Sequence, residues 1–231
     1  MKLSIVIPAY NEEKRILPTL EDYHSFFQKK LKDNFEIIVV PNNCSDKTFE
    51  VVKDFVDNKK QIRVFNLPNY SGKGGAVLKG FELARGDLIG FADADDSVDA
   101  ENFYKLYKNI NCYDGIIASR KIKGAKIFPK RSFFQEFSSN VFSKIANVLI
   151  NLEFKDTQCG GKIFTKKTVN ILADNYSEVG WIFDVDILCI CKNNRLKIKE
   201  FPINWHDATG SVLTFKDKIV SLFELLRYRF K

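Results

Sequence analysis

Three carboxylates within four residues are the feature of this sequence best suited to chemistry. Asp93, Asp95 and Asp96 follow the apolar run 88–91. Asp93 and Asp95 alternate along an extended chain, so both side chains can face one point. Crowded carboxylates repel unless a cation shares them, and such oxygen ligands suit Mg²⁺ or Mn²⁺ carrying substrate phosphates. A solvated acidic turn that caps the next helix is the alternative interpretation.

Three more polar clusters follow predicted strands, at 8–13, 41–46 and 71–75. The third cluster, Ser-Gly-Lys-Gly-Gly, has glycines that let backbone N–H groups approach an anion, and its Lys73 could neutralise a diphosphate. It is not a Walker A loop, because the Gly-x-x-x-x-Gly-Lys-Ser/Thr pattern is absent. The first two clusters could hold a nucleoside, or they could simply start helices.

The elements that must position these clusters alternate between strand-like and helix-like patterns. Apolar runs predict strands at 3–7, 35–40, 61–66, 87–91 and 114–118. Three- and four-residue periodicity predicts helices near 15–31, 46–57, 73–84 and 101–109. Strands that are apolar on both faces indicate an α/β fold with a mainly parallel central sheet flanked by helices. Ligands of such sheets collect at the carboxyl ends of the strands, where all four clusters fall.

After residue 120 the alternation gives way to a different pattern. A basic loop at 121–131 precedes a long apolar helix at 133–151, and a basic amphipathic helix begins near Phe215. The helix at 133–151 is apolar over a wider arc than one core contact needs, which a lipid-facing surface would explain. The helix from Phe215 could lie on an anionic membrane surface or pack its apolar stripe on the core. No linker or repeat divides the 231 residues, so we expect a single domain with halves 1–119 and 120–231.

Composition narrows the class of partner. Lys and Arg number 36 against 29 Asp and Glu, which gives a formal charge of +7 and favours anionic partners. The sequence has neither an arginine-rich arm nor the cysteine and histidine spacing of a zinc site, so nothing in it indicates binding to nucleic acid. The five cysteines form no CxxC pair, which favours reduced thiols in the cytosol. No apolar run approaches the roughly 20 residues needed to span a bilayer, and the first apolar run resembles a strand more than a signal peptide.

Several of these motifs together resemble a known family. Segments 4–13, 73–76, 85–87 and 93–95 resemble the nucleotide-sugar half of family 2 glycosyltransferases with the GT-A (Rossmann-like) fold. Segments 119–120, 131–132, 156–160, 162–165, 181–186, 204–205 and 210–211 are similar to the dolichyl-phosphate β-glucosyltransferases, relatives of the dolichyl-phosphate mannose synthases.

The resemblance implies an inverting transfer of a sugar from a nucleotide diphosphate to a polyprenyl monophosphate. Asp93 and Asp95 would hold Mg²⁺ or Mn²⁺, and Arg120, Arg131 and Ser132 would bind the acceptor phosphate. The residues expected to bind the nucleotide-sugar are Pro8, Tyr10, Glu12, Asn42, Lys73, Asp93, Ala94 and Asp95.

Four other residues have open roles. Asp184 falls where some relatives carry an acidic base, so it could orient an acceptor or pair with a cation such as Lys162. His206 could touch the diphosphate, but packing in its loop beside Trp205 is the simpler expectation. Cys159 has no local histidine partner and is expected to fill space. Gly161 stands where relatives carry a larger residue, which predicts a more open sugar pocket.

Two departures from the family pattern bear on the donor. Asn42 stands where many relatives carry an Asp that accepts the uracil N–H, and Ser97 replaces a Gln of the mannose branch. We expect glucose transfer from UDP-glucose by a peripheral protein at the cytoplasmic face of a membrane. A GDP-mannose donor, a glycan acceptor and a catalytically inactive nucleotide-sugar-binding subunit are the alternatives.

Overall fold

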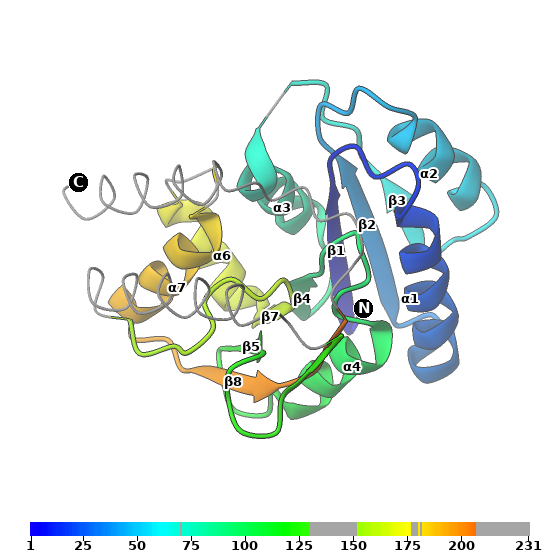
Figure 1. Cartoon of the computed structure of the whole chain (residues 1–231). Coiled ribbons are helices and arrows are strands. Elements are labelled where there is room, and N and C mark those ends of the chain that lie inside the picture. The colour runs from blue at the N-terminus through cyan, green and yellow to red at the C-terminus, as the bar shows by residue number, and fades with distance from the viewer. Residues whose placement is uncertain (70, 130–151, 177–179, 181, 207–231) are drawn as a thin grey trace.

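A seven-stranded sheet organises the molecule (Figure 1), described here from a computed structural model over residues 1–69, 71–129, 152–176, 180 and 182–206. Its strand order is β3-β2-β1-β4-β7-β5-β8. The strands are β1 (Leu3–Ala9), β2 (Phe35–Pro41), β3 (Ile62–Val64), β4 (Leu88–Phe91), β5 (Gly115–Ser119), β7 (Lys162–Thr165) and β8 (Ile198–Pro202). Strands from both predicted halves of the chain therefore share one sheet.

Helices cover both faces of this sheet (Figure 1). They are α1 (Ile16–Leu31), α2 (Thr48–Val56), α3 (Gly72–Leu83), α4 (Ala100–Asn109), α6 (Lys166–Asn175) and α7 (Phe183–Asn193). Side chains alternate along each strand, so neighbours point to opposite faces. In β1, Ile5 packs in one core cluster with α1, α2 and α4, whereas Val6 packs in a second cluster with α3, α6 and α7.

The predicted elements of the first half are confirmed, with small differences at their ends. β3 is only three residues long, and α2 begins at Thr48, two residues later than expected. Pro18 lies in the first turn of α1, where its missing N–H leaves no intrahelical hydrogen bond unmade. The mainly parallel sheet is also confirmed, because four of its six strand pairs are parallel.

β7 is the exception, and it matters for the site. This strand is antiparallel to both β4 and β5, and its first residue, Lys162, pairs with Phe91 at the end of β4. The start of β7 therefore lies at the edge where the parallel strands end. This reversal places the turn 159–161 beside the carboxylates that follow β4.

β6 (Lys126–Phe128) and β9 (Asn204–His206) form a second, two-stranded parallel sheet. The predicted helices at 133–151 and from Phe215 onward, together with Arg131 and Ser132, lie outside the described residues. Within the described ranges, no helix combines the length and the apolar character required to cross a membrane.

Candidate active site

The carboxyl edge of the sheet gathers charged side chains from five separate segments. Their sources are the loops after β1 and β4, the first turn of α3, the start of β7 and the first turn of α7. The residues are Glu12, Lys73, Asp93, Asp95, Lys162 and Asp184.

Four of these side chains form an alternating chain of charges. Lys162 is fully buried and bonds the Asp184 carboxylate, and its Nζ also donates to the Cys159 carbonyl at 2.8 Å. The other Asp184 oxygen lies 3.6 Å from Lys73 Nζ, which in turn lies 2.7 Å from Asp93 Oδ1. Sequence analysis left two roles open for Asp184, orienting an acceptor or pairing with a cation, and the structure shows its pairing with Lys162.

This pairing decides the basicity of Asp184. Burial alone would raise the pKa of this carboxyl, but the Lys162 and Lys73 ammonium groups together hold it below its ordinary value. A carboxylate held in that way is a poor proton acceptor at neutral pH. The observed contacts of Asp184 are those of a buried ion pair, and its role in the reaction stays a prediction.

The carboxylates that follow β4 are partly buried and repel one another. Burial, followed by repulsion from Asp93, raises the pKa of Asp95, whose Oδ1 accepts from the Ser97 N–H at 3.1 Å. Burial and three neighbouring carboxylates raise the pKa of Asp96 to about 7. A nearby cation would relieve both effects.

Asp93 and Asp95 fit a divalent metal held jointly with substrate. Among the described residues, no group of three His, Cys, Asp or Glu side chains comes together as a metal site. Mg²⁺ commonly takes one or two carboxylates and completes its shell with water and substrate phosphates. The pair of aspartates therefore suits an ion that arrives with a diphosphate.

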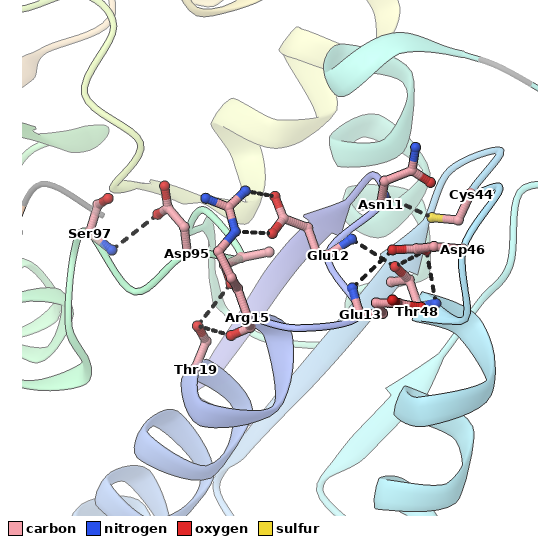
Figure 2. Close-up of polar contacts among 11 residues, drawn as sticks. Asn11, Glu12, Glu13, Arg15, Thr19, Cys44, Asp46, Thr48, Asp95 and Ser97 are labelled. Atoms are coloured by element: carbon pink, nitrogen blue, oxygen red, sulfur yellow. Dashed lines mark hydrogen bonds and ion pairs between the residues drawn. The ribbon is translucent and has the colours of Figure 1, made fainter. Parts of the chain in front are cut away.

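Glu12 forms an ion pair with Arg15, a residue that the sequence analysis did not identify. Arg15 bonds both Glu12 oxygens, at 2.7 and 2.8 Å, and Figure 2 shows its guanidinium between the Glu12 and Asp95 carboxylates. Burial, followed by Asp95 and Asp93, raises the pKa of Glu12 despite Arg15. The Glu-x-x-Arg spacing in the loop just before α1 was the available signal.

The loop after β1 is tied to the loop after β2 (Figure 2). The Glu12 N–H donates to Thr48 Oγ1 at 2.7 Å, and the Glu13 N–H donates to Asp46 Oδ2 at 3.1 Å. Tyr10, directly after β1, is 50% exposed, whereas Pro8 belongs to β1 itself. Their contact with a nucleoside stays a prediction.

Helix α1 supports the backbone of the loop between β4 and α4, which carries Asp93, Asp95 and Asp96 and is called the carboxylate loop below. Thr19 Oγ1 donates to the Ala94 carbonyl at 2.9 Å, and the buried Tyr23 hydroxyl donates to the Val98 carbonyl. Asp22 accepts from the Ala100 N–H at 2.8 Å. Sequence analysis missed these residues because their partners lie more than 70 positions away.

Asn42 holds the start of α3. Its Oδ1 accepts from the Ser71 N–H and hydroxyl, both at 3.1 Å, and its Nδ2 donates to the Gly72 carbonyl at 2.9 Å. Gly72 has φ of 65°, a conformation that favours glycine. The predicted contact between Asn42 and a base would have to share this amide, which already positions the turn that carries Lys73.

The expected effect of Gly161 is wrong. A Cβ at Gly161 would lie 3.2 to 3.4 Å from Val98, Ala118 and Leu106, so this position faces closely packed core side chains and not a sugar pocket. The neighbouring Gly160 faces the site instead. A Cβ there would lie 1.9 Å from Asp93 Oδ2.

Arg120 lies at the end of β5 in a buried ion pair. Its Nε and Nη2 donate to the two Asp156 oxygens at 2.7 and 2.8 Å, and its guanidinium lies 4.6 Å from the Trp205 ring centroid. Burial alone would raise the pKa of Asp156, but Arg120 lowers it to about 2. A role for Arg120 in binding an acceptor phosphate stays a prediction.

Two further expectations concern His206 and Cys159. His206 stacks on Phe128 with ring centroids 5.6 Å apart, and its imidazole is 56% exposed. Cys159 is fully buried, and burial raises the pKa of its thiol to about 12. The interpretation of Cys159 as a packing residue is confirmed.

The Arg-Gly-Asp segment at 85–87 has a structural role. The Arg85 N–H donates to Glu36 Oε1 at 2.7 Å, and the Gly86 N–H donates to Ser4 Oγ at 2.8 Å. A Cβ at Gly86 would come within 2.7 Å of the Ser4 nitrogen. This motif therefore secures the turn into β4, at the opposite end of that strand from Asp93.

The overall fold has close counterparts among solved glycosyltransferases. Glucosyl-3-phosphoglycerate synthase from M. tuberculosis superposes with a TM-score of 0.68 at 16% identity, covering 99% of this chain and 80% of that one. S. aureus TarS in complex with UDP-GlcNAc superposes with a TM-score of 0.66 at 20% identity, covering 99% and 65%. The sheet and its flanking helices are those of the GT-A class.

Sequence comparison gives the family. The model for glycosyl transferase family 2 matches residues 4–171, so the chain belongs to that family and is a glycosyltransferase. The dolichyl-phosphate β-glucosyltransferase of Saccharomyces cerevisiae is 34% identical over 227 residues, covering 90% of this chain and 68% of the relative. The human enzyme of that name is 30% identical over 225 residues, covering 92% and 69%.

Proposed function

We propose that this glycosyltransferase moves glucose from UDP-glucose to a dolichyl or similar polyprenyl monophosphate with inversion, using Mg²⁺ or Mn²⁺. The observation that carries the proposal is the meeting of Asp93, Asp95 and Lys73 at one edge of the sheet. The acceptor class is supported by the names of the relatives in yeast and human. The metal is supported by a structural neighbour solved with Mn²⁺, UDP and phosphoglyceric acid.

The charges at the site suit departure of a nucleoside diphosphate. Asp93 and Asp95 would hold the ion against the diphosphate, and Lys73 would place a second positive charge beside it. The ion, when bound, would stabilise the negative charge that grows on the leaving group. Asn42 acts indirectly, because it fixes the turn that carries Lys73.

The acceptor chemistry explains why a strong base is dispensable. A phosphate monoester is already anionic at neutral pH, so the enzyme needs mainly to position it. This agrees with the lowered pKa of Asp184. We assign acceptor binding to Arg120, Arg131 and Ser132.

The experiment measures transfer from radiolabelled sugar nucleotides to short polyprenyl phosphates, with Mn²⁺ or with a chelator. We expect a chloroform-soluble product from UDP-glucose that disappears with the chelator and in Asp95→Ala. Asp54→Ala, at an exposed position on α2, is the matched control and should keep activity. Product formed equally well by Asp95→Ala would contradict the metal assignment.

GDP-mannose is a second candidate donor, and the surroundings of Asn42 favour testing it. The Asn42 oxygen already accepts two hydrogen bonds, so it is less available to a uracil N–H than the Asp of many relatives would be. Transfer from GDP-mannose, with none from UDP-glucose, would replace the proposed donor. Transfer to glycans alone would replace the proposed acceptor.

The proposed place of action is the cytoplasmic face of a membrane. The support is the apolar character of the segment at 133–151 and the basic, amphipathic character of the segment from Phe215 onward. We expect the protein to co-sediment with liposomes that contain anionic lipid and to be released by salt. Failure to bind anionic liposomes at low salt would contradict peripheral membrane contact.

A further inference from the structure

Asp93 already has a cation in this structure. Lys73 Nζ lies 2.7 Å from Asp93 Oδ1, and the two side chains are 31% and 26% exposed. The same carboxylate is proposed as a metal ligand. An ammonium and a divalent ion would therefore compete for one partly exposed carboxylate, since bringing both to it sets two positive charges close together.

Lys73 has a second anionic partner that stays in place. Asp184 Oδ2 lies 3.6 Å from Lys73 Nζ, and Asp184 is itself bonded by the fully buried Lys162. The Cys159 carbonyl holds Lys162 from another side, at 2.8 Å. Because Lys162 and Asp184 are buried and Asp93 is partly exposed, the Lys73–Asp93 contact is the one that incoming solutes can replace.

Gly160 restricts how Asp93 can respond. A Cβ at Gly160 would lie 1.9 Å from Asp93 Oδ2, so the backbone of the 159–161 turn packs directly against this carboxylate. Asp93 has little room to move toward that turn. A change of partner at Asp93 is therefore expected to involve movement of the more extended Lys73 side chain rather than movement of Asp93 toward the turn.

We propose that Lys73 is the resident counter-ion of Asp93 and is displaced when metal and diphosphate bind together. The Lys162–Asp184 pair keeps Lys73 within reach as its ammonium moves from Asp93 to the diphosphate. This inference rests on the proposed function for its metal and its diphosphate. Mn²⁺ alone should bind weakly, because it must displace the Lys73 ammonium from Asp93 when no other anion is present to accept it. A nucleoside diphosphate supplies that anion and should therefore strengthen Mn²⁺ binding.

The test measures Mn²⁺ affinity directly, from the electron paramagnetic resonance signal of free Mn²⁺, without acceptor or sugar transfer. Lys73→Met removes the competing ammonium, and Lys79→Met on the same helix is the matched control, because Lys79 pairs with Glu82 away from the site. Without nucleotide, we expect Lys73→Met to bind Mn²⁺ about tenfold more tightly than the wild type, and Lys79→Met to be unchanged. With UDP present, the gain in Mn²⁺ affinity should be large in the wild type and small in Lys73→Met.

Two outcomes would overturn the inference. One is Mn²⁺ affinity in Lys73→Met that is equal to or weaker than that of the wild type, including the case in which neither binds. The other is an equal effect of UDP on both proteins. Circular dichroism checks folding, and Lys73→Gln replaces Lys73→Met if that variant unfolds.

The result is separable from the proposed function. If Lys73→Met binds Mn²⁺ more tightly but the wild type transfers no glucose, the displacement of Lys73 is supported and the proposed donor and acceptor are wrong. If the wild type transfers glucose normally but Lys73→Met binds Mn²⁺ with unchanged affinity, only the displacement of Lys73 is contradicted and the proposed function stands.

Discussion

Gly160 and Asp93 pack so closely that no side chain fits between them, since a Cβ on Gly160 would lie 1.9 Å from Asp93 Oδ2. The two residues come from adjacent antiparallel segments, the turn before β7 and the loop after β4. The contact fixes one side of a carboxylate whose other side faces Lys73.

Gly160→Ala should therefore push Asp93 out of place and reduce sugar transfer about 100-fold or more, because misplacing a reacting group by about 1 Å has effects of that size. Gly161→Ala is the control. Its Cβ would approach Val98 at 3.2 Å in the core, which should lower the free energy of unfolding by about 1 kcal/mol and leave activity largely intact. Initial rates and urea unfolding of both variants check the prediction, and equal activity in the two would contradict it.

Thr19→Val should weaken the support of the carboxylate loop. The substitution removes the hydroxyl that donates to the Ala94 carbonyl, leaves that buried acceptor unpaired and should lower the free energy of unfolding by about 1 kcal/mol. We expect the Mn²⁺ concentration for half-maximal transfer to rise about tenfold. Thr19→Ser keeps the hydroxyl and should restore most of both properties; a metal requirement identical in Thr19→Val and the wild type would argue against the support role.

The Arg120–Asp156 pair predicts a pH dependence of stability. The pKa of Asp156 is about 2 in the folded protein, below its ordinary value of 3.8, so its ionised form stabilises the fold. The stabilisation, about 2 kcal/mol, is fully present above the unfolded pKa and is lost as the pH falls through about 2. At pH 3 the Asp156 carboxyl of the folded protein is still mostly ionised, so Asp156→Asn should cost about 1 kcal/mol more at pH 7 than at pH 3.

Urea unfolding of the wild type and Asp156→Asn at these two pH values measures this difference. Asp174→Asn, at an exposed position on α6, is the control and should show no such change between the two pH values. A cost of Asp156→Asn that is independent of pH would show that the ion pair does not account for it.

Glu36→Ala separates stability from catalysis. Its buried carboxylate accepts from Ser4, the Arg85 N–H and Arg63, at 2.7, 2.7 and 2.8 Å. Removing it leaves these donors without their acceptor, and we expect a loss of about 3 kcal/mol in the free energy of unfolding. The network lies away from Asp93, so activity per folded molecule should be unchanged at low temperature. A fall in kcat without a fall in stability would refute this division.

Sequence patterns determined most of the elements and the identity of the central carboxylates. Continuous apolar runs predict buried parallel strands, and the polar residues that follow them must meet at the carboxyl edge of the sheet. For that reason Asp93, Asp95 and Lys73 were brought together as expected. These predictions depend on local periodicity and on a general property of parallel sheets.

Only the tertiary structure decided what surrounds Asp93. The reversed direction of β7 is not encoded in periodicity, yet it brings Gly160 against Asp93 and Lys162 to Asp184. It also separates two adjacent glycines, one facing the site and one facing the core. The support of the Ala94 carbonyl by Thr19 is likewise a contact between distant segments, which residue types and spacing alone do not reveal.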